Sequence, residues 1–431
     1  MSDTTPQGSD AMPGTALPAG TGPLAGLRVL ELGHFVAAPF ATRLLGDLGA
    51  EIIKIEPPGG DPVRQWGARH QGHAPWWSVH ARNKRCITLD LKKPEAVAIV
   101  LGLVRQCDAL VENFRPGQLD KLGLGREALL KARPGLVIAR ISGYGQDGPY
   151  RDKPAFGVIG EAIGGLRHLT DHPPGTSDLP PVRVGVSLGD SVAGIYAALG
   201  VVSALWRRDK AGGDGPAPDQ APTQRPGTEI DVALTESVFS LLEGALPEYG
   251  TLGSIRQPAG GGIATAAPTN AYRARDGIRV LIAANSDPLF RRLAMAMGQP
   301  DLLEDPRFSG NQARVAHVRE LDALIGGWTA GFDGAALEEL VTQAGIPCTR
   351  VFNIADCAAD PQFLARGMVR AVQDPLHGEV LHPGVVPRVD GAGFPPRSTG
   401  PAVGADNEAV LRDLLGLDAG AIETLRAGGV I

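Results

Sequence analysis

The chain has 431 residues, of which 43% are hydrophobic and 20% charged, and its formal net charge is −6. This length suggests two or three domains, and the acidic balance excludes the broad basic surface of a nucleic-acid-binding protein. No apolar run reaches the roughly 18 to 20 residues that cross a membrane, and residues 1–22 lack a secretion-signal pattern, so we expect a cytoplasmic protein.

The first half of the chain alternates β-rich runs with helical periods. We expect strands at 27–32, 51–56, 85–91, 109–112 and 136–141, with helices at 38–48 and 94–106. Strands that recur with helices between them predict βαβ units and a parallel sheet in an α/β fold.

The second half predicts a different organisation. A long helix at 191–208 runs into a Pro/Gly/Gln-rich tract at 211–227, which we expect to be a flexible insert. A strand and a helix at 229–243, a hairpin turning at Asp276-Gly277 and helices over 287–344 follow. This mixture predicts a smaller α+β domain and linker helices at 228–349, while the polar tail at 1–22 is expected to be disordered.

Several common chemistries lack their motifs. Glu56 ends the second strand where a ribose-binding acid would stand, but the chain after Gly33 has no G-x-G-x-x-G, which argues against a dinucleotide-dependent dehydrogenase. A G-x-S-x-G elbow is also missing. The four cysteines and nine histidines show no metal-ligand spacing, so we expect neither a metal site nor a tightly bound cofactor.

Asp190 lies at the start of the long helix, in Gly189-Asp190-Ser191. Carboxylates favour helix starts because free backbone N–H groups and the helix dipole stabilise them, so one interpretation is a helix cap. The small residues that follow, including Gly194, would also let a large group approach closely. A carboxylate held there could therefore act as a nucleophile on an activated acyl group.

A second informative segment leaves the fourth strand as Leu110-Val-Glu-Asn-Phe-Arg-Pro-Gly117. Asn113 and Phe114 lie at the carboxyl end of a strand, where open α/β sheets bind ligands. Asn113 could bond an amide or a base edge, Phe114 could stack, and Arg115 or Lys121 could meet a phosphate. Ordinary strand-to-helix connections and solvated turns remain the alternatives for this segment and for the basic cluster at 83–85.

Together these motifs resemble family III CoA-transferases, the superfamily of formyl-CoA transferase, carnitine-CoA transferase and α-methylacyl-CoA racemase. The resemblance covers nearly all of residues 23–431. Its motifs follow in order: Pro-Leu-Ala-Gly-Leu-Arg-Val-Leu-Glu-Leu at 23–32, Leu-Gly-Ala-Glu-Ile-Ile-Lys-Ile-Glu-Pro-Pro at 48–58, Asn-Lys-Arg at 83–85, Val-Glu-Asn-Phe-Arg-Pro-Gly at 111–117, Gly-Tyr-Gly-Gln-Asp-Gly-Pro-Tyr at 143–150, and Gly-Asp-Ser at 189–191.

The resemblance implies a Rossmann-like CoA-binding domain built from 23–210 and 350–431, and an interlocked homodimer. It implies an acyl-CoA:carboxylate CoA-transferase whose substrates are a CoA thioester donor and a carboxylic acid acceptor. Asp190 would be the nucleophile, forming first an aspartyl–acyl anhydride and then an aspartyl-CoA thioester. Because water would hydrolyse the anhydride, the Gly260-Gly261-Gly262 loop, which resembles the family's glycine lid, would close over it.

The family's CoA contacts map to His34, Phe35, Val36, Ala37, Asn83, Lys84, Arg85, Asn113, Phe114 and Lys121. Two basic family positions differ here, since they are occupied by Pro57 and Ser142. We therefore expect Arg64, Lys84 or Arg85 to meet the nucleotide phosphates instead.

Two alternatives to a transferase remain open. Racemases of the superfamily place a His and Asp pair after the Gly-Pro-Tyr segment, and residues 155–161 contain neither, which favours a transferase. A CoA-binding protein without catalysis is the other alternative. The overall pattern is closest to transferases of succinyl-CoA and malate- or citramalate-like acids, and Arg167 or Arg183 could bind the second carboxylate of such an acid.

Overall fold

The computed structural model describes residues 22–210, 227–389 and 394–431. The described residues fall into two compact units: those within Met1–Gly164, Val186–Leu241 and Pro361–Ile431, and those within Gly165–Gly185 and Leu242–Asp360. Apart from Gly22 and Gly227, the tail and insert expected at 1–22 and 211–227 lie outside the described residues.

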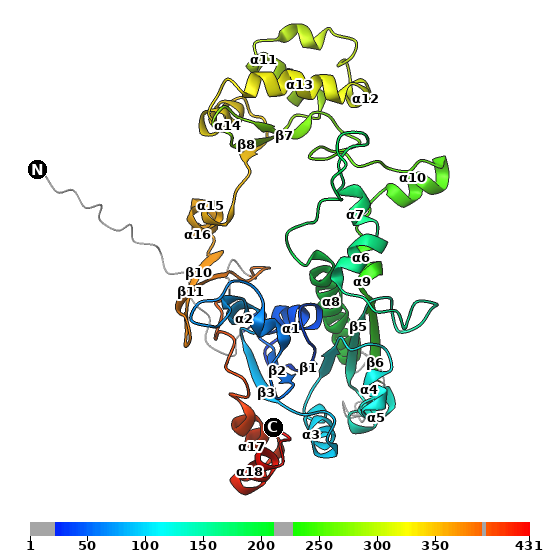
Figure 1. Ribbon diagram of the computed structural model, residues 1–431, viewed down its shortest axis with the longest axis vertical. Helices are drawn as coiled ribbons and strands as arrows, with labels where there is room; N and C mark the ends of the chain where they lie inside the picture. Colours follow the sequence, from blue (N-terminus) through cyan, green and yellow to red (C-terminus); the bar gives the residue numbers. More distant parts are fainter. Residues whose placement is uncertain (1–21, 211–226, 390–393) are drawn as a thin grey trace, which may run out of the picture. The chain divides into compact units, whose positions relative to one another are not determined.

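A six-stranded sheet with strand order β3-β2-β1-β4-β5-β6 forms the centre of the first unit (Figure 1). Its strands are β1 (Arg28–Leu32), β2 (Glu51–Glu56), β3 (Lys84–Thr88), β4 (Ala109–Glu112), β5 (Val137–Ser142) and β6 (Thr228–Ala233). All five pairings are parallel. This is the strand order of the Rossmann fold, and it confirms the expected Rossmann-like sheet.

Helices cover both faces of the sheet, which explains why its inner strands are apolar on both sides. One face packs on α3 (Pro94–Val104), α5 (Arg126–Ala132) and the C-terminal helices α17 (Asn407–Leu415) and α18 (Ala419–Ala427), the last two in red in Figure 1. The other face packs on α1 (Ala37–Asp47) and α8 (Leu188–Lys210). The C-terminal segment therefore returns to the first domain, as expected.

The small residues of α8 let α1 pack closely against it. A Cβ on Gly194 would lie 2.8 Å from the carbonyl O of Ala37 and 3.0 Å from the ring of Phe40. α1 therefore occupies the space beside Gly194 that the sequence left open for a large group, and the two helices pack together on the sheet.

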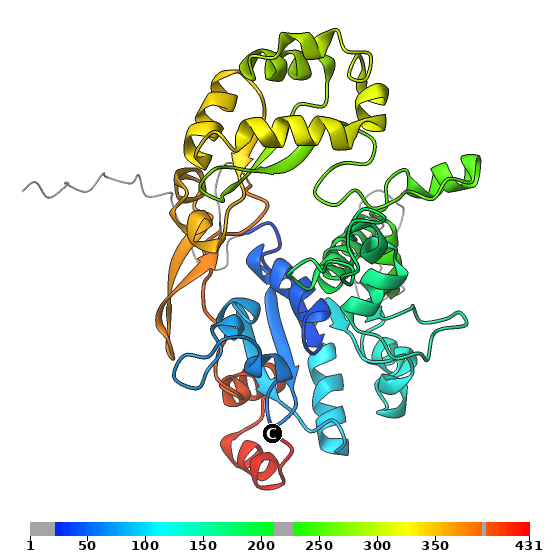
Figure 2. The ribbon, with the colours of Figure 1, turned by 45° about the horizontal axis from the view of Figure 1, so that its top comes forward.

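The other elements of the first unit are short. They are η1 (Pro62–Gln65), α2 (Pro75–His80), α4 (Gln118–Lys121), α6 (Gly157–Ile163), α9 (Leu234–Phe239), α16 (Pro361–Ala365), β10 (Val369–Asp374) and β11 (Gly378–Pro383). β10 and β11 form an antiparallel hairpin, the orange ribbon in Figure 2, which the sequence did not predict.

The second unit is built on an antiparallel sheet of order β7-β8-β9. Its strands are β7 (Thr269–Arg273), β8 (Arg279–Ala283) and β9 (Cys348–Arg350), and its helices are α7 (Leu166–Leu169), α10 (Ala245–Leu252), α11 (Asp287–Ala296), η3 (Pro300–Leu303), α12 (Asn311–Ala316), α13 (Val318–Thr329), α14 (Gly334–Gln343) and α15 (Ile354–Ala359). Side chains of β7, β8, α11, α13 and α14 share one apolar core. The hairpin with Asp276-Gly277 at its turn is present as expected.

The domain boundaries differ from the expected ones. Residues 228–241 belong to the first unit, because β6 pairs with β5 along its whole length. Residues 165–185 and 350–360 belong to the second unit. These boundaries depend on pairing between strands that are distant in sequence. Local sequence patterns do not show which strands pair.

Candidate functional site

Asn113 joins the carboxyl ends of β1 and β4. Its Oδ1 accepts the backbone N–H of His34 at 2.9 Å, and its Nδ2 donates to the carbonyl O of His34 at 2.8 Å. The ring of Phe114 lies edge-on to the His34 ring, with centroids 5.3 Å apart. The strand order reverses between β1 and β4, and open α/β sheets bind ligands in this crevice. Asn113 thus shapes the loop after β1 and keeps one lone pair and one N–H for a ligand.

The next residue, Phe35, is held in the left-handed region at φ 62°. Its N–H donates to Asp61 Oδ1 at 3.2 Å, and its carbonyl O accepts from His80 Nε2 at 2.6 Å. Burial lowers the pKa of His80 to about 3, so the ring is neutral and carries its proton on Nε2. Val36 and Ala37 follow as buried side chains, and they can offer a ligand only backbone groups at the start of α1.

A pocket of about 190 Å³ opens at this edge of the sheet. Its lining comes from the ends of β1 to β4 and from α4: Leu32, His34, Ile55, Glu56, Pro57, Pro58, Leu89, Asp90, Leu91, Lys92, Phe114, Gln118 and Leu122. The buried Nδ1 of His34 has no hydrogen-bond partner among the described residues, and burial lowers the pKa of this ring. The pocket therefore offers apolar walls for a flat ring, an unpartnered polar atom and the cation of Lys92.

The sequence did not single out Leu89, Lys92 or Gln118. Leu89 and Lys92 follow β3, and the rule that drew attention to Asn113 after β4 applies equally to them. Lys121, which the sequence did predict, lies on α4 as an exposed side chain next to this pocket's Gln118 and Leu122.

The structure gives Lys84 a different role from the predicted contact with a CoA phosphate. Its ammonium is completely buried and donates to Glu31 Oε2 at 2.8 Å and to the carbonyl O of Pro39 at 2.7 Å. Glu31 also pairs with the buried Lys54 at 2.7 Å, and Lys54 with Asp61 at 2.8 Å. Burial alone would raise the pKa of Glu31, but the two ammonium groups lower it to about 2. Lys84 thus belongs to an internal ion network and is closed to a phosphate.

Arg64 and Arg85 do not form the expected phosphate site either. Arg64 makes two 2.7 Å hydrogen bonds to Glu56 and stacks on Trp77. Arg85 and Asn83 lie at the start of β3, and β3 runs parallel to β2. The start of a parallel strand is on the opposite edge of the sheet from its carboxyl end. Asn83 and Arg85 are therefore separated from His34, Asn113 and Phe114 by the length of the strands.

Asp190 is the third residue of α8 and is half-buried. Arg207 at the other end of α8 bonds Thr228 at the start of β6, so the first turn of α8 points toward the carboxyl ends of the strands. A Cβ on Gly157 of α6 would lie 2.1 Å from Asp190 Oδ2, and one on Gly189 would lie 2.7 Å from the carbonyl O of Gly157. Two glycines thus let α6 and α8 meet at the carboxylate, which lies inside the first turn and not at the cap position.

Aromatic rings connect Asp190's neighbourhood to the loop after β1. Phe156, the residue before Gly157, lies edge-on to Phe35 with centroids 6.0 Å apart, and Phe35 lies 5.2 Å from the ring of Trp66. Phe156 is 67% exposed, so this aromatic wall faces solvent. The structure therefore brings Phe35 and Asp190 into one continuous region of the first unit.

The glycine loop and the two candidate arginines, Arg167 and Arg183, belong to the second unit. There a pocket of about 600 Å³ includes Gly260, Gly261 and Gly262 together with Pro173, Arg256 and Arg319. Gly260 has φ 62°, and a Cβ on Gly261 would lie 2.7 Å from Asn270 Oδ1, so the loop requires its glycines. Arg167 donates weakly to the carbonyl O of Pro181 at 3.4 Å. The closing of this loop as a lid stays a prediction.

The model of CoA-transferase family III matches residues 24–407. The chain belongs to this family. It is 45% identical over 95% of its length to succinyl-CoA–D-citramalate CoA-transferase of Chloroflexus aurantiacus, covering 98% of that protein. It is 37% identical over 95% of its length to the alpha subunit of succinyl-CoA–L-malate CoA-transferase of the same organism, covering 92% of that subunit. The crystal structure of a CAIB/BAIF family protein from Brucella suis matches 91% of this chain and 99% of its own, with TM-score 0.78 and 32% identity.

The protein is therefore a CoA-transferase, an enzyme for which CoA thioesters are substrates, as the resemblance implied. In the described parts of this CoA-transferase, no group of three or more His, Cys, Asp or Glu side chains is arranged to hold a metal ion. Among the helices that the structure describes, one, α8, is long and apolar enough to span a membrane, but it packs against α1 and β5 like a core helix. The cytoplasmic location stays a prediction.

Proposed function

We propose that this CoA-transferase moves CoA from succinyl-CoA, or a similar donor, to a small dicarboxylate or hydroxydicarboxylate, with Asp190 as the nucleophile. The observation that carries the proposal is the position of the Asp190 carboxylate in the first turn of α8, against the bare Cα of Gly157. The N-terminal end of a helix stabilises a carboxylate in its ionised, nucleophilic form.

The reaction begins when an oxygen of Asp190 attacks the thioester carbonyl of the donor. The C–S bond breaks, CoA leaves as a thiolate, and an aspartyl–succinyl anhydride forms. The thiolate then attacks the carbonyl carbon of Asp190, which forms an aspartyl-CoA thioester and releases succinate. The acceptor carboxylate repeats these two steps in reverse order, so that the acceptor leaves as its CoA thioester and Asp190 is regenerated.

The surroundings of Asp190 suit this sequence. The backbone N–H groups of the first turn can stabilise negative charge that develops on the attacked carbonyl. The crevice at His34, Asn113 and Phe114 would hold the CoA nucleotide, and the wall of Phe35 and Phe156 lies between that crevice and Asp190. A thioester reaching along this wall would arrive at the carboxylate. The named activities of the two Chloroflexus relatives support the choice of donor and acceptor.

The test is an acceptor screen with succinyl-CoA, read by mass spectrometry of the CoA products. We expect citramalate or malate to be converted and longer or shorter dicarboxylates to react more slowly. Asp190→Ala should lose activity by about 10⁴-fold or more, because no other group supplies the nucleophile. Hydroxylamine should convert Asp190 of the wild type to a hydroxamate after donor is added. An active Asp190→Ala enzyme would overturn the mechanism.

We also propose that the enzyme is a homodimer, as the family resemblance implies. Supporting this, Ile195, Leu199 and Trp206 of α8 are 49%, 59% and 65% exposed, and large apolar side chains in a row on one helix favour burial by a partner surface. Light scattering should give twice the chain mass, and Leu199→Glu should shift the protein toward monomer. A wild type that is monomeric at assay concentration would overturn the proposal.

A further inference from the structure

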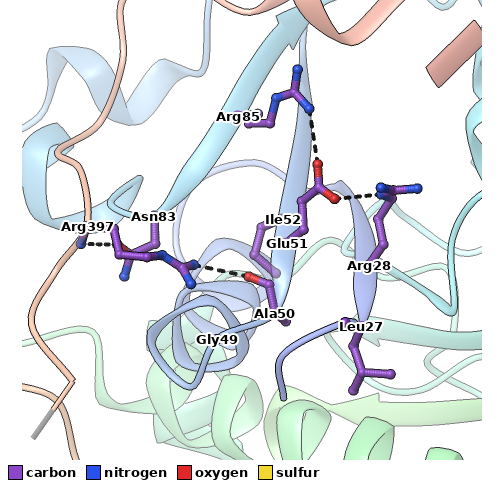
Figure 3. Close-up of a pocket in the computed structure, with 10 residues that line it drawn as sticks. Leu27, Arg28, Gly49, Ala50, Glu51, Ile52, Asn83, Arg85 and Arg397 are labelled. Atoms are coloured by element: carbon purple, nitrogen blue, oxygen red, sulfur yellow. Dashed lines mark hydrogen bonds and ion pairs between the residues drawn. The ribbon is translucent and has the colours of Figure 1, made fainter. Parts of the chain in front are cut away.

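A second pocket of the first unit, about 410 Å³ in volume, lies at the amino ends of β1, β2 and β3 (Figure 3). Its lining consists of Gly26, Leu27, Arg28, Gly49, Ala50, Glu51, Ile52, Asn83, Arg85 and Arg397. β2 runs from Glu51 in this pocket to Glu56 in the carboxyl-edge pocket. At roughly 3.3 Å per residue, the strand separates the two by about 17 Å, so this pocket is distinct from the CoA crevice.

The charges around this pocket are unbalanced. Three guanidinium groups, of Arg28, Arg85 and Arg397, meet one lining carboxylate, that of Glu51. Figure 3 shows Glu51 between Arg28 and Arg85, with bonds of 2.8 and 3.1 Å. Asp413, outside the lining, pairs with Arg85 at 3.5 Å. Even with Asp413 counted, one positive charge is left over, and guanidinium groups at half-buried positions bind oxyanions well.

Arg397 is the guanidinium best placed to receive a ligand. Its Nη2 donates to the carbonyl oxygens of Gly46 and Ala50 at 3.0 and 3.3 Å, which anchors the group at the pocket without neutralising its charge. Its backbone N–H donates to Asn83 Oδ1 at 2.6 Å, which fixes the segment that carries it. Within the described residues, Nε and Nη1 of Arg397 have no bonded partner, so two nitrogens with three N–H groups are left for an anion.

We infer that this amino-edge pocket is a second binding site, for a small oxyanion bearing two or more carboxylate or phosphate groups. Leu27 and Ile52 supply an apolar floor, and a Cβ on Gly26 would meet nothing within 4 Å, so the entrance is open. An anion held there would tie the starts of the three strands to the C-terminal segment through Arg397. The site does not depend on the proposed acyl transfer.

The test titrates two probes, inorganic pyrophosphate and citrate, into the full-length enzyme by calorimetry at fixed ionic strength. Saturating CoA is present, so that the crevice at the other edge is filled. We expect saturable binding of at least one probe, and the probe that binds tells whether phosphate or carboxylate groups are preferred. Arg397→Gln should weaken this binding about tenfold. Arg69→Gln, an exposed arginine outside the pocket, should leave it unchanged.

Glu51→Gln should change the affinity for the probe in the opposite direction from Arg397→Gln. Removing the lining carboxylate should strengthen binding severalfold, whereas a purely structural disturbance would weaken it. Melting temperature and transferase turnover of each variant show whether it is folded. The inference is overturned if neither probe saturates the wild type, if Arg397→Gln binds as well as Arg69→Gln, or if Glu51→Gln binds more weakly than the wild type.

Discussion

The two edges of the six-stranded sheet both carry basic residues, but they use them differently. At the carboxyl edge, Lys54, Lys84 and Arg64 are paired with Glu31, Asp61 and Glu56, so they build the support under the loop after β1. At the amino edge, Arg28, Arg85 and Arg397 surround a pocket and outnumber its carboxylate. In the proposed function, the carboxyl edge would therefore bind CoA mainly through backbone groups, rings and a few side chains, while the amino edge carries an excess of positive charge.

This difference follows from how parallel strands and helices alternate. Helices that follow parallel strands begin at the carboxyl edge, so their unpaired N–H groups already favour anions there. Cations beneath that edge can then hold the geometry of the loop: Lys54 donates to the carbonyl O of Gly33 at 2.7 Å and pairs with Asp61, which accepts the N–H of Phe35. At the amino edge helices end, and an anion must be met by side chains.

Gly157→Ala is the substitution at the carboxyl edge for which we expect the largest loss of activity. The new Cβ would lie 2.1 Å from Asp190 Oδ2 and must displace it. A nucleophile moved by about 1 Å loses on the order of 10²-fold in rate, so kcat should fall by about that factor with little change in the KM of succinyl-CoA. Gly326→Ala on α13 is the matched control, because its Cβ would meet nothing within 4 Å. Equal turnover rates for the two variants would contradict the role of Asp190 as the nucleophile.

Lys84→Met separates support from ligand binding at the same edge. Loss of this ammonium leaves Glu31 with Lys54 alone in a buried setting, so the free energy of unfolding should fall by about 3 kcal/mol. The KM for succinyl-CoA should stay within twofold of the wild type. Lys131→Met, on the exposed side of α5, should change neither quantity. Urea unfolding measures the free energy of unfolding, and steady-state kinetics measure KM. A KM raised tenfold would indicate that Lys84 binds a CoA phosphate after all.

The sequence predicted the sheet well because its strands are short apolar runs between helical periods. β2 and β4 have the predicted bounds, and the glycine and small-residue pattern that drew attention to Asp190 is one that the packing of α8 does require. The family resemblance added the ordered motifs. These signals are local, and local signals are what a sequence expresses most directly.

The edge at which a residue lies was harder to predict. Asn83, Lys84 and Arg85 are adjacent in sequence, but β3 begins among them, so Lys84 points into the ion network while Arg85 and Asn83 reach the amino edge. Lys92, four residues after β3, reaches the other edge. The partner of a charged side chain is also invisible in sequence, since Glu31 is 53 residues from Lys84.

Lys92→Gln and Arg85→Gln test the two edges against each other. Lys92 lines the carboxyl-edge pocket, and a charge-assisted bond to a CoA phosphate is worth enough for the KM of succinyl-CoA to rise about tenfold when it is lost. Arg85→Gln should leave that KM within twofold, because Arg85 lies at the amino edge. The effect of Lys92→Gln should shrink at high salt. Equal KM increases for both variants would mean that CoA reaches both edges.

His80→Gln is the smallest test, and it concerns the support of Phe35. The pKa of His80 is about 3 in the fold and near 6.5 when unfolded, so the unfolded chain binds more protons between these values. This histidine therefore contributes stability that is present above pH 6.5 and lost as pH falls toward 3. Urea midpoints should drop less between pH 7 and 4.5 in the variant than in the wild type.

A second buried group, Glu112, also makes the stability of the fold depend on pH, so the effect of His80 must be read from the difference between His80→Gln and the wild type. Burial raises its pKa to about 8, so the native chain holds a proton there that the unfolded chain releases near pH 4.5, and stability falls as pH rises between these values. Its effect opposes that of His80 in the wild-type profile but is common to both proteins, so it cancels in their difference. A His80→Gln difference that is flat with pH would mean that His80 is charged in the fold, and that Phe35 is held by Asp61 without a neutral imidazole.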